Sequence, residues 1–289
     1  MEKLVKINSL NLWTENFGKF NDPACLLISG AGAHSRFWTD HFCKNLSNKG
    51  YFIIRYDHRD TGLSSPVDIS EEPYNLNELA KDALAILDDY QIKRFHLIGH
   101  SMGGIIAQIL SIFHSTRVLS LTCISSAIPQ ITYSLSKEEK EIYANTLKVL
   151  LANRPNNNYE KSIDGFIKIW KYLHGNIEMD EKIARQYTKG LYTRSRHDIT
   201  NVYKHANAMQ RLPNHSKSLN HLFLPSLVIH GAKDPLIFLS QGKALAEAIP
   251  SSDFCIIPDM GHTIFSHHLE NTLIKIIAKH MQKSSSQSP

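Results

Sequence analysis

A short apolar run in this chain ends in Gly99-His100-Ser101-Met102-Gly103, and a segment rich in small residues follows directly. The run Phe95–Ile98 is bulky and apolar, as expected for a strand that is buried on both faces. The small residues after Ser101 allow a helix to pack closely against that strand. The pattern therefore predicts a sharp strand-to-helix turn that holds the hydroxyl of Ser101 clear of the sheet, as a candidate nucleophile.

Apolar strands alternate with amphipathic helices through most of the sequence. Two short alternating segments at 4–7 and 10–15 predict an opening β-hairpin. Further strands are predicted at 24–29, 51–56, 94–99 and 118–125. Helices are predicted between them at 35–48, 76–90 and 102–114. This alternation is typical of an α/β fold with a mostly parallel central sheet and helices on both faces.

The alternation is interrupted after Pro129. Residues 130–216 contain no strand-like run rich in Val and Ile, and their periodicity predicts helices near 137–152, 159–174, 180–192 and 197–210. The earlier pattern then resumes with a strand at 224–230, a helix at 239–248, a strand at 254–257 and a closing helix at 265–282. We therefore expect one α/β core from 1–129 and 217–282, an inserted helical cap at 130–216, and a polar, disordered tail at 283–289.

The composition limits the possible partners and location. The 289 residues are 42% hydrophobic and 20% charged, which is typical of a soluble globular protein. The net charge of +5 is small and the basic residues are scattered among acidic ones, so nucleic acid is not an expected partner. No apolar stretch has the length of a signal peptide or membrane span. Cys25, Cys123 and Cys255 lie in apolar runs, which predicts buried free thiols and a cytoplasmic location. The oligomeric state stays open.

The sixteen histidines form no metal-binding pattern along the sequence. No helical His-x-x-x-His pair has a carboxylate nearby, and His267 and His268 are adjacent, so they cannot share one helical face. We therefore expect neither a metal nor an organic cofactor.

A serine hydroxyl needs a base within hydrogen-bond reach, and the base needs a third group that holds its tautomer. Asp234 follows the predicted strand 224–230, and His262 follows the strand that ends at Ile257. Both should emerge at the carboxyl ends of parallel strands, where open α/β sheets place their sites. The chain order Ser101, Asp234, His262 is the order that this turn motif requires, so these residues are the candidate catalytic triad.

The tetrahedral intermediate of such a reaction also needs backbone N–H donors for its oxyanion. Met102 supplies one at the start of its helix, where the helix dipole helps. The second is expected in the loop Ser29–Ala33, with Ala31 as the candidate. This glycine-rich loop could also be interpreted as a phosphate loop, but it lacks the Gly-Lys-Ser/Thr ending of that motif.

With these motifs in place, residues 4 to 282 resemble the α/β-hydrolase-fold superfamily with a helical cap. The run Tyr56–Ser64 resembles the loop after the fourth strand of that family. Its Arg-Asp-Thr-Gly sequence is similar to the corresponding sequence of aclacinomycin methylesterase-like members. The resemblance implies that Asp57 and Arg59 shape a turn. Many relatives have His-Gly before the oxyanion residue, whereas this chain has Ser29-Gly30.

The candidate residues predict a serine hydrolase that forms an acyl-enzyme, most simply a carboxylic ester hydrolase acting on a small to medium apolar ester. Its activity should fall as His262 becomes protonated at low pH, because a protonated imidazole accepts no proton. A lactonase, a carbon–carbon bond hydrolase and a perhydrolase would use the same triad. An epoxide hydrolase or dehalogenase is disfavoured, because those relatives have Asp at the position of Ser101.

The substrate pocket is expected under the cap, whose aromatic residues predict apolar walls. Gly30, His34, His100 and Trp170 are the candidate lining residues, although His100 could instead be a packing residue. An alternative of another class is a ligand-binding protein on a hydrolase scaffold, with slow or no turnover.

Overall fold

The computed structural model describes residues 1–194, 202–250 and 252–285. In this part of the chain an eight-stranded sheet has the order β1-β2-β4-β3-β5-β6-β7-β8. Its strands are β1 (Glu2–Ile7), β2 (Leu10–Phe17), β3 (Ala24–Ile28), β4 (Phe52–Tyr56), β5 (Phe95–His100), β6 (Val118–Ile124), β7 (Ser226–Gly231) and β8 (Asp253–Ile257). Strand β2 pairs antiparallel with β1 and β4, and the remaining pairs are parallel. The predicted α/β fold with a mostly parallel sheet is confirmed.

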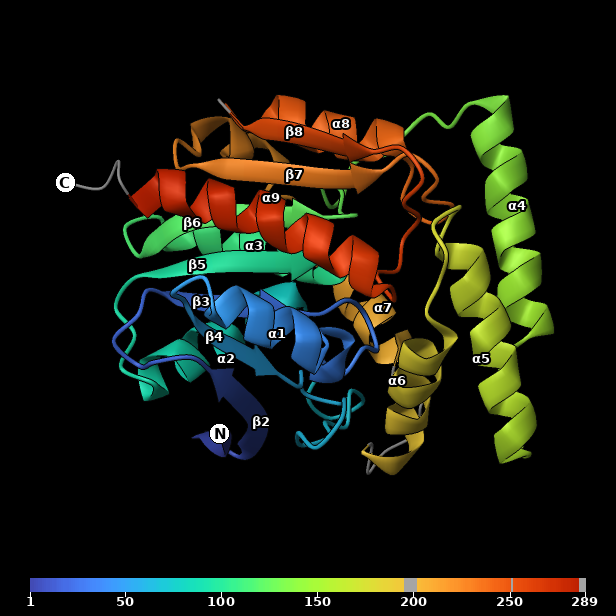
Figure 1. Cartoon of the computed structure of the whole chain (residues 1–289), viewed down its shortest axis with the longest axis horizontal. Coiled ribbons are helices and arrows are strands. Elements are labelled where there is room, and N and C mark those ends of the chain that lie inside the picture. Colours follow the sequence, from blue (N-terminus) through green and yellow to red (C-terminus); the bar gives the residue numbers. More distant parts are fainter. Residues whose placement is uncertain (195–201, 251, 286–289) are drawn as a thin grey trace.

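Helices cover both faces of the sheet, as Figure 1 shows. The core helices are α1 (Asp40–Ser47), α2 (Leu76–Asp89), α3 (Met102–Phe113), α8 (Leu239–Ala248) and α9 (His267–Ser285). Phe42 of α1 and Leu273 of α9 belong to the apolar core on one face. Leu79 of α2 and Leu245 of α8 belong to the core on the other face. The sheet is thus buried on both sides, which explains why its central strands are continuous apolar runs.

Three details of the sequence prediction were wrong. The expected helix at 35–48 is a 3₁₀ turn, η1 (Ser35–Phe37), followed by α1, because Thr39 accepts a hydrogen bond from the backbone N–H of Phe42 and caps a new helix. The disordered tail was expected from residue 283, but helix α9 continues to Ser285, and the Oγ of Ser284 donates to the carbonyl of His280. Residues 286–289 lie outside the described residues. Cys255 is half-buried, because β8 is an edge strand.

We define the cap as residues 130–216. Its described helices lie at the end of the sheet toward which the parallel strands point (Figure 1). Its described helices are α4 (Lys137–Ala152), α5 (Tyr159–Leu173), α6 (Glu181–Thr193) and α7 (Val202–Gln210). The first residues of the helix predicted at 197–210 lie outside the described part of the chain. Ile163 and Tyr187 of the cap belong to the same apolar cluster as α1 and α9, so cap and core share one hydrophobic interior. A 3₁₀ segment that sequence patterns did not indicate, η3 (Ser216–His221), leads back to the core.

The loop after β4 anchors the cap to the core. The carboxylate of Asp57 accepts backbone N–H groups from Ser35 at 2.7 Å and Leu63 at 2.9 Å, and the guanidinium of Arg194 lies 3.3 Å away. Arg59 makes two 2.7 Å hydrogen bonds to the buried carboxylate of Asp82. Asp57 and Arg59 thus make contacts that shape and hold this turn.

Two further observations bear on location. Among the described helices, none combines the length and the apolar character that crossing a bilayer would require. Cys25, Cys43 and Cys123 are buried free thiols.

Candidate active site

Ser101 lies at the junction of β5 and α3 in a backbone conformation with φ of 54° and ψ of −121°. L-residues rarely adopt this region, so the surrounding structure must hold it there. The N–H of Ser101 donates to the carbonyl of Ile124 at 2.9 Å. A Cβ on Gly103 would lie 2.2 Å from the carbonyl oxygen of Ile28, and one on Gly99 would lie 2.2 Å from that of Gly103. The flanking glycines are therefore required for this close strand-to-helix turn.

Asp234 and His262 come together in loops that follow neighbouring strands. The Nδ1 of His262 lies 2.8 Å from the Oδ2 of Asp234, and both residues are 5% exposed. The Oδ1 of Asp234 accepts the backbone N–H groups of Leu236 and Ile237, each at 2.9 Å. With Nδ1–H donating to this fixed carboxylate, the Nε2 of His262 is left to accept a proton.

The environment of Asp234 favours its ionised form. Burial alone would raise the pKa of this carboxyl, but the adjacent imidazole of His262, the hydrogen bond between them and the nearby His230 lower it below its ordinary value. A carboxylate that stays charged accepts the Nδ1–H of His262 and keeps its imidazole oriented.

Strand register brings these three residues to one edge of the sheet. Gly99 pairs with Cys123, Cys123 with Val228, and Val228 with Phe254. Strands β5, β7 and β8 therefore end at the same edge of the sheet, and this edge faces the cap (Figure 1). Among the described residues no hydrogen bond joins the Oγ of Ser101 to His262, and such bonds often tighten only when substrate binds.

His100 connects the loop of His262 to the strand that carries Ser101. Its Nε2–H donates to the carbonyl of His262 at 2.7 Å, and its ring packs 4.8 Å from the ring of His262 and 4.5 Å from that of Phe37. Burial lowers the pKa of His100 to about 3, so the ring is neutral. These contacts make His100 a packing residue behind the candidate triad.

Two backbone N–H groups are available next to Ser101. Met102 is the first residue of α3, and the first N–H groups of a helix have no partner within it. In the loop after β3, no hydrogen bond within the described residues engages the N–H of Ala31, and a Cβ on its neighbour Gly30 would lie 3.3 Å from the Cβ of Ser101. The loop that carries Ala31 therefore approaches Ser101 at Gly30, and Met102 is the residue after Ser101.

His205 of α7 holds this loop from the cap, and no sequence motif pointed to it. Its Nδ1 accepts the N–H of Gly32 at 3.0 Å, and its Nε2–H donates to the carbonyl of Arg59 at 3.1 Å. Burial lowers the pKa of His205 to about 4, so the ring stays neutral and its Nδ1 can accept. The only local signal was a lone histidine in a polar cap helix.

Replacing His205 with alanine is expected to lower kcat/KM for an ester about 10- to 100-fold, because a displacement of about 1 Å at the reacting groups can cost about 10²-fold. Glutamine can both accept from Gly32 and donate to Arg59, so His205→Gln should recover much of the rate. Tyr203→Ala, on the exposed side of the same helix, serves as the control. Wild-type kcat/KM in a folded His205→Ala protein would contradict this role.

A groove of about 1170 Å³ opens between the start of α1 and helix α6. His34 is one of its lining residues, and its Nε2 lies 3.2 Å from the carbonyl of Tyr187. Trp170 lies deeper in the cap, where its Nε1–H donates to the hydroxyl of Thr188 at 2.8 Å and its ring contacts that of Phe265. The lining residues of this groove do not include the candidate triad, so the groove lies beside the site and does not contain it.

Comparison with known proteins places the chain in a family. Residues 23–269 match the family described as alpha/beta hydrolase fold, and the chain belongs to it. Rhodomycin D methylesterase DauP of Streptomyces sp. (strain C5) is 29% identical over 277 residues, with 91% of this chain and 92% of the relative covered. The 3-oxoadipate enol-lactonase 1 of Acinetobacter baylyi is 26% identical over 248 residues, with 85% and 84% covered.

A solved structure has the same fold. The enol-lactonase from Burkholderia xenovorans LB400 superimposes with a TM-score of 0.74 at 20% identity, over 96% of this chain and 98% of that one. The family and the named relatives indicate a hydrolase.

Proposed function

We propose that this protein is a serine hydrolase that cleaves carboxylic esters, with Ser101, His262 and Asp234 as its catalytic triad. The observation that carries the proposal is the buried 2.8 Å hydrogen bond between His262 and Asp234 at the sheet edge where Ser101 is held in a strained turn. Nucleophilic acyl transfer requires a serine together with a base that a buried carboxylate orients, and these three residues supply both.

In this mechanism the Oγ of Ser101 attacks the ester carbonyl carbon while the Nε2 of His262 takes the hydroxyl proton. The N–H groups of Ala31 and Met102 stabilise the negative charge that develops on the carbonyl oxygen. Collapse of the tetrahedral intermediate breaks the bond to the alcohol, which leaves with the proton from His262. Water then gives a proton to His262 and attacks the carbonyl carbon of the acyl-enzyme. When the second tetrahedral intermediate collapses, the bond from that carbon to Oγ breaks, His262 returns the proton to Oγ, and the acid leaves.

The substrate class that we propose is the methyl ester of a small to medium apolar acid. The relative named a methylesterase matches this chain over almost its whole length, which supports an ester with a small alcohol. The cap contributes aromatic rings, since Trp170 and Tyr187 both pack on Phe265. We propose that these rings face the acyl group of the substrate, which favours an apolar acid.

The first experiment is intact mass measurement after treatment with a fluorophosphonate ester, which reacts with activated serine hydroxyls. We expect one adduct on the wild-type protein and none on Ser101→Ala. In a panel of methyl esters, lactones and vinylogous diketones of matched size, we expect methyl esters to have the highest kcat/KM. Faster lactone cleavage would favour a lactonase, an alternative that the lactonase relative supports. Faster diketone cleavage would favour a carbon–carbon bond hydrolase. A folded wild-type protein without adduct would contradict the serine mechanism and favour a ligand-binding protein.

A further inference from the structure

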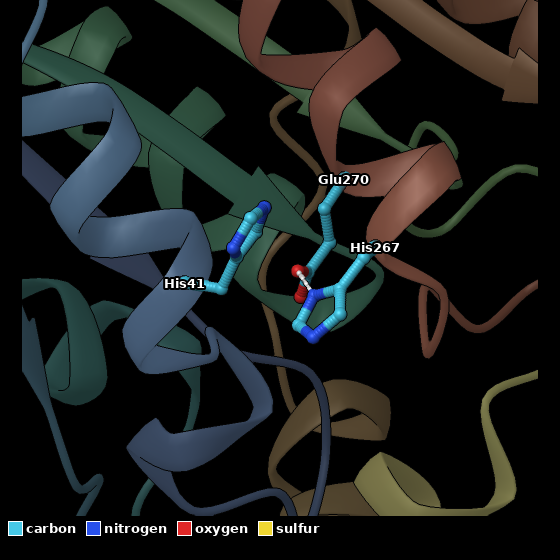
Figure 2. A group of neighbouring side chains, drawn as sticks. All are labelled: His41, His267 and Glu270. Carbon is cyan, nitrogen blue, oxygen red and sulfur yellow. Dashed lines mark hydrogen bonds and ion pairs between the residues drawn. The ribbon is translucent and has the colours of Figure 1, made fainter.

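A cluster of potential metal ligands lies outside the candidate active site, where α1 meets the start of α9. Figure 2 shows His41 of α1 beside His267 and Glu270 of the first turn of α9. One ligand atom from each of the three side chains lies within 4.8 Å of the others. The Nδ1 of His267 is 3.1 Å from the Oε2 of Glu270, and the rings of His41 and His267 have centroids 4.2 Å apart.

The carboxylate of this cluster has little compensation for its charge. Glu270 is fully buried, and its Oε1 accepts a 2.6 Å hydrogen bond from the hydroxyl of Thr39. Among the described residues its only ion-pair partner is His267, which carries a charge only when protonated. A cation between the carboxylate and the imidazoles would relieve the cost of this buried charge.

The surroundings of the histidines suit metal ligands. His41 has an amide partner on each ring nitrogen, because Nε2 is 2.9 Å from the Oδ1 of Asn271 and Nδ1 is 3.3 Å from the Nδ2 of Asn45. Nε2–H can donate to the carbonyl oxygen of Asn271, which leaves Nδ1 to bind a metal in place of its contact with the amide nitrogen of Asn45. A hydrogen bond from the other ring nitrogen is the usual outer arrangement of a metal-bound histidine. Thr39, His41 and His267 border the groove described above, whereas Glu270 lies behind them, so one side of the cluster is open.

We propose that His41, His267 and Glu270 form a binding site for a divalent metal ion of the zinc class, with its remaining coordination position open to the groove. Two imidazole nitrogens and one carboxylate oxygen are a ligand set that Zn²⁺ favours. Metal–ligand distances of about 2.0–2.2 Å bring tetrahedral ligands to about 3.4 Å from one another, so the cluster must contract. The side chain of His267 is 50% exposed and can make that movement.

Bound metal would join two helices from opposite ends of the chain. Asn271 follows Glu270 directly, and it lies 230 positions from His41. A metal ion held by both helices would fix the start of α9 against α1, so it should raise the temperature of unfolding.

The test is calorimetric titration of the full-length protein with Zn²⁺ alone, combined with thermal unfolding in its presence and absence. We expect one site and a Tm that rises with Zn²⁺. His41→Gln, His267→Ala and Glu270→Gln should each weaken binding at least about tenfold. His268→Ala is the matched control, since His268 is the next exposed residue of the same helix and should leave binding unchanged.

Two outcomes would overturn the proposal. The first is that the wild-type protein binds no Zn²⁺. The second is that the wild type and all three variants bind Zn²⁺ with equal affinity, because the ion would then occupy other histidines or Cys255. His267→Ala keeps the test decisive if the buried Glu270 variant fails to fold, because the side chain of His267 is half-exposed.

Discussion

Replacing Ser101 with alanine is expected to lower kcat/KM for the best ester by at least about 10⁴-fold, because no other group supplies the attacking oxygen. Alanine keeps the Cβ of serine and loses only the hydroxyl, so the strained turn at φ 54° gains no new clash. Initial rates with a chromogenic ester, followed over a wide range of enzyme concentration, measure the residual activity. The circular dichroism spectrum and Tm should match those of the wild type.

Two further variants separate catalysis from stability. His262→Ala should lower kcat/KM by a similar factor, and the double variant should be no worse than either single one, since the two groups act in one step. Ser111→Ala is the matched control. Ser111 is a buried serine of α3, the helix that begins directly after Ser101, and its Oγ donates to the carbonyl of Ala107. If Ser101→Ala kept activity within tenfold of the wild type while remaining folded, Ser101 would not be the nucleophile.

Local patterns were sufficient to predict the sheet and its order of elements. Strands such as β5 and β7 are buried on both faces, so they are apolar throughout and easy to distinguish from amphipathic helices. Errors occurred where a single side chain decides a boundary. Thr39 is the N-cap of α1, and its side chain accepts a hydrogen bond from the backbone N–H of Phe42. The periodicity of apolar residues contains no information about this hydrogen bond.

The candidate triad could be predicted because each member follows a strand. Ser101 and Asp234 come directly after β5 and β7, and parallel strands carry such residues to one sheet edge. The strain at Ser101 and the hydrogen bond from His262 to Asp234 are consequences of that topology.

Residues that act through long-range contacts could not be predicted in this way. The bond from His205 to Gly32 joins positions 173 apart, and His41 meets the start of α9 from the opposite end of the chain. Helical spacing along a sequence reveals only ligands that share one helix, whereas His41 and the pair His267 and Glu270 lie on two separate helices. Each of these histidines is isolated in the sequence, and only the packing of α7 on the core or of α1 on α9 gives it partners.

Acidification from about pH 7 to pH 5 is expected to cause a large loss of stability, because this fold buries several neutral histidines. Burial is the main cause that lowers their pKa values, to about 3 for His58 and His100 and to about 4 for His34, His96, His174 and His205. In the unfolded chain these imidazoles have pKa values near about 6.5.

The sign of the effect follows from proton binding. Between about pH 4 and pH 6.5 the unfolded chain binds more protons than the folded protein, so the free energy of unfolding rises with pH in this window and levels off above it. Each such histidine contributes up to about 1.4 kcal/mol per pH unit. Asp82 and Glu270, whose pKa values burial raises, act in the opposite direction over part of the same range. From about pH 6.5 to pH 5 each such histidine can therefore remove up to about 2 kcal/mol, and the six together up to about 12 kcal/mol. This is comparable with the whole stability of a domain, which is about 5–15 kcal/mol.

Urea unfolding followed by tryptophan fluorescence at about pH 5, 6 and 7.5 measures this slope. His96 provides the test of its origin, since its Nδ1 is 2.8 Å from the hydroxyl of Ser120 while its Nε2 is buried without a partner in the described structure. Glutamine does not titrate, so His96→Gln should reduce the slope between about pH 5 and 6 by up to about 1.4 kcal/mol per pH unit. His221→Gln replaces an exposed histidine and should leave the slope unchanged. A free energy of unfolding that stays constant from about pH 7.5 to 5 would show that the buried histidines are not held neutral by the fold.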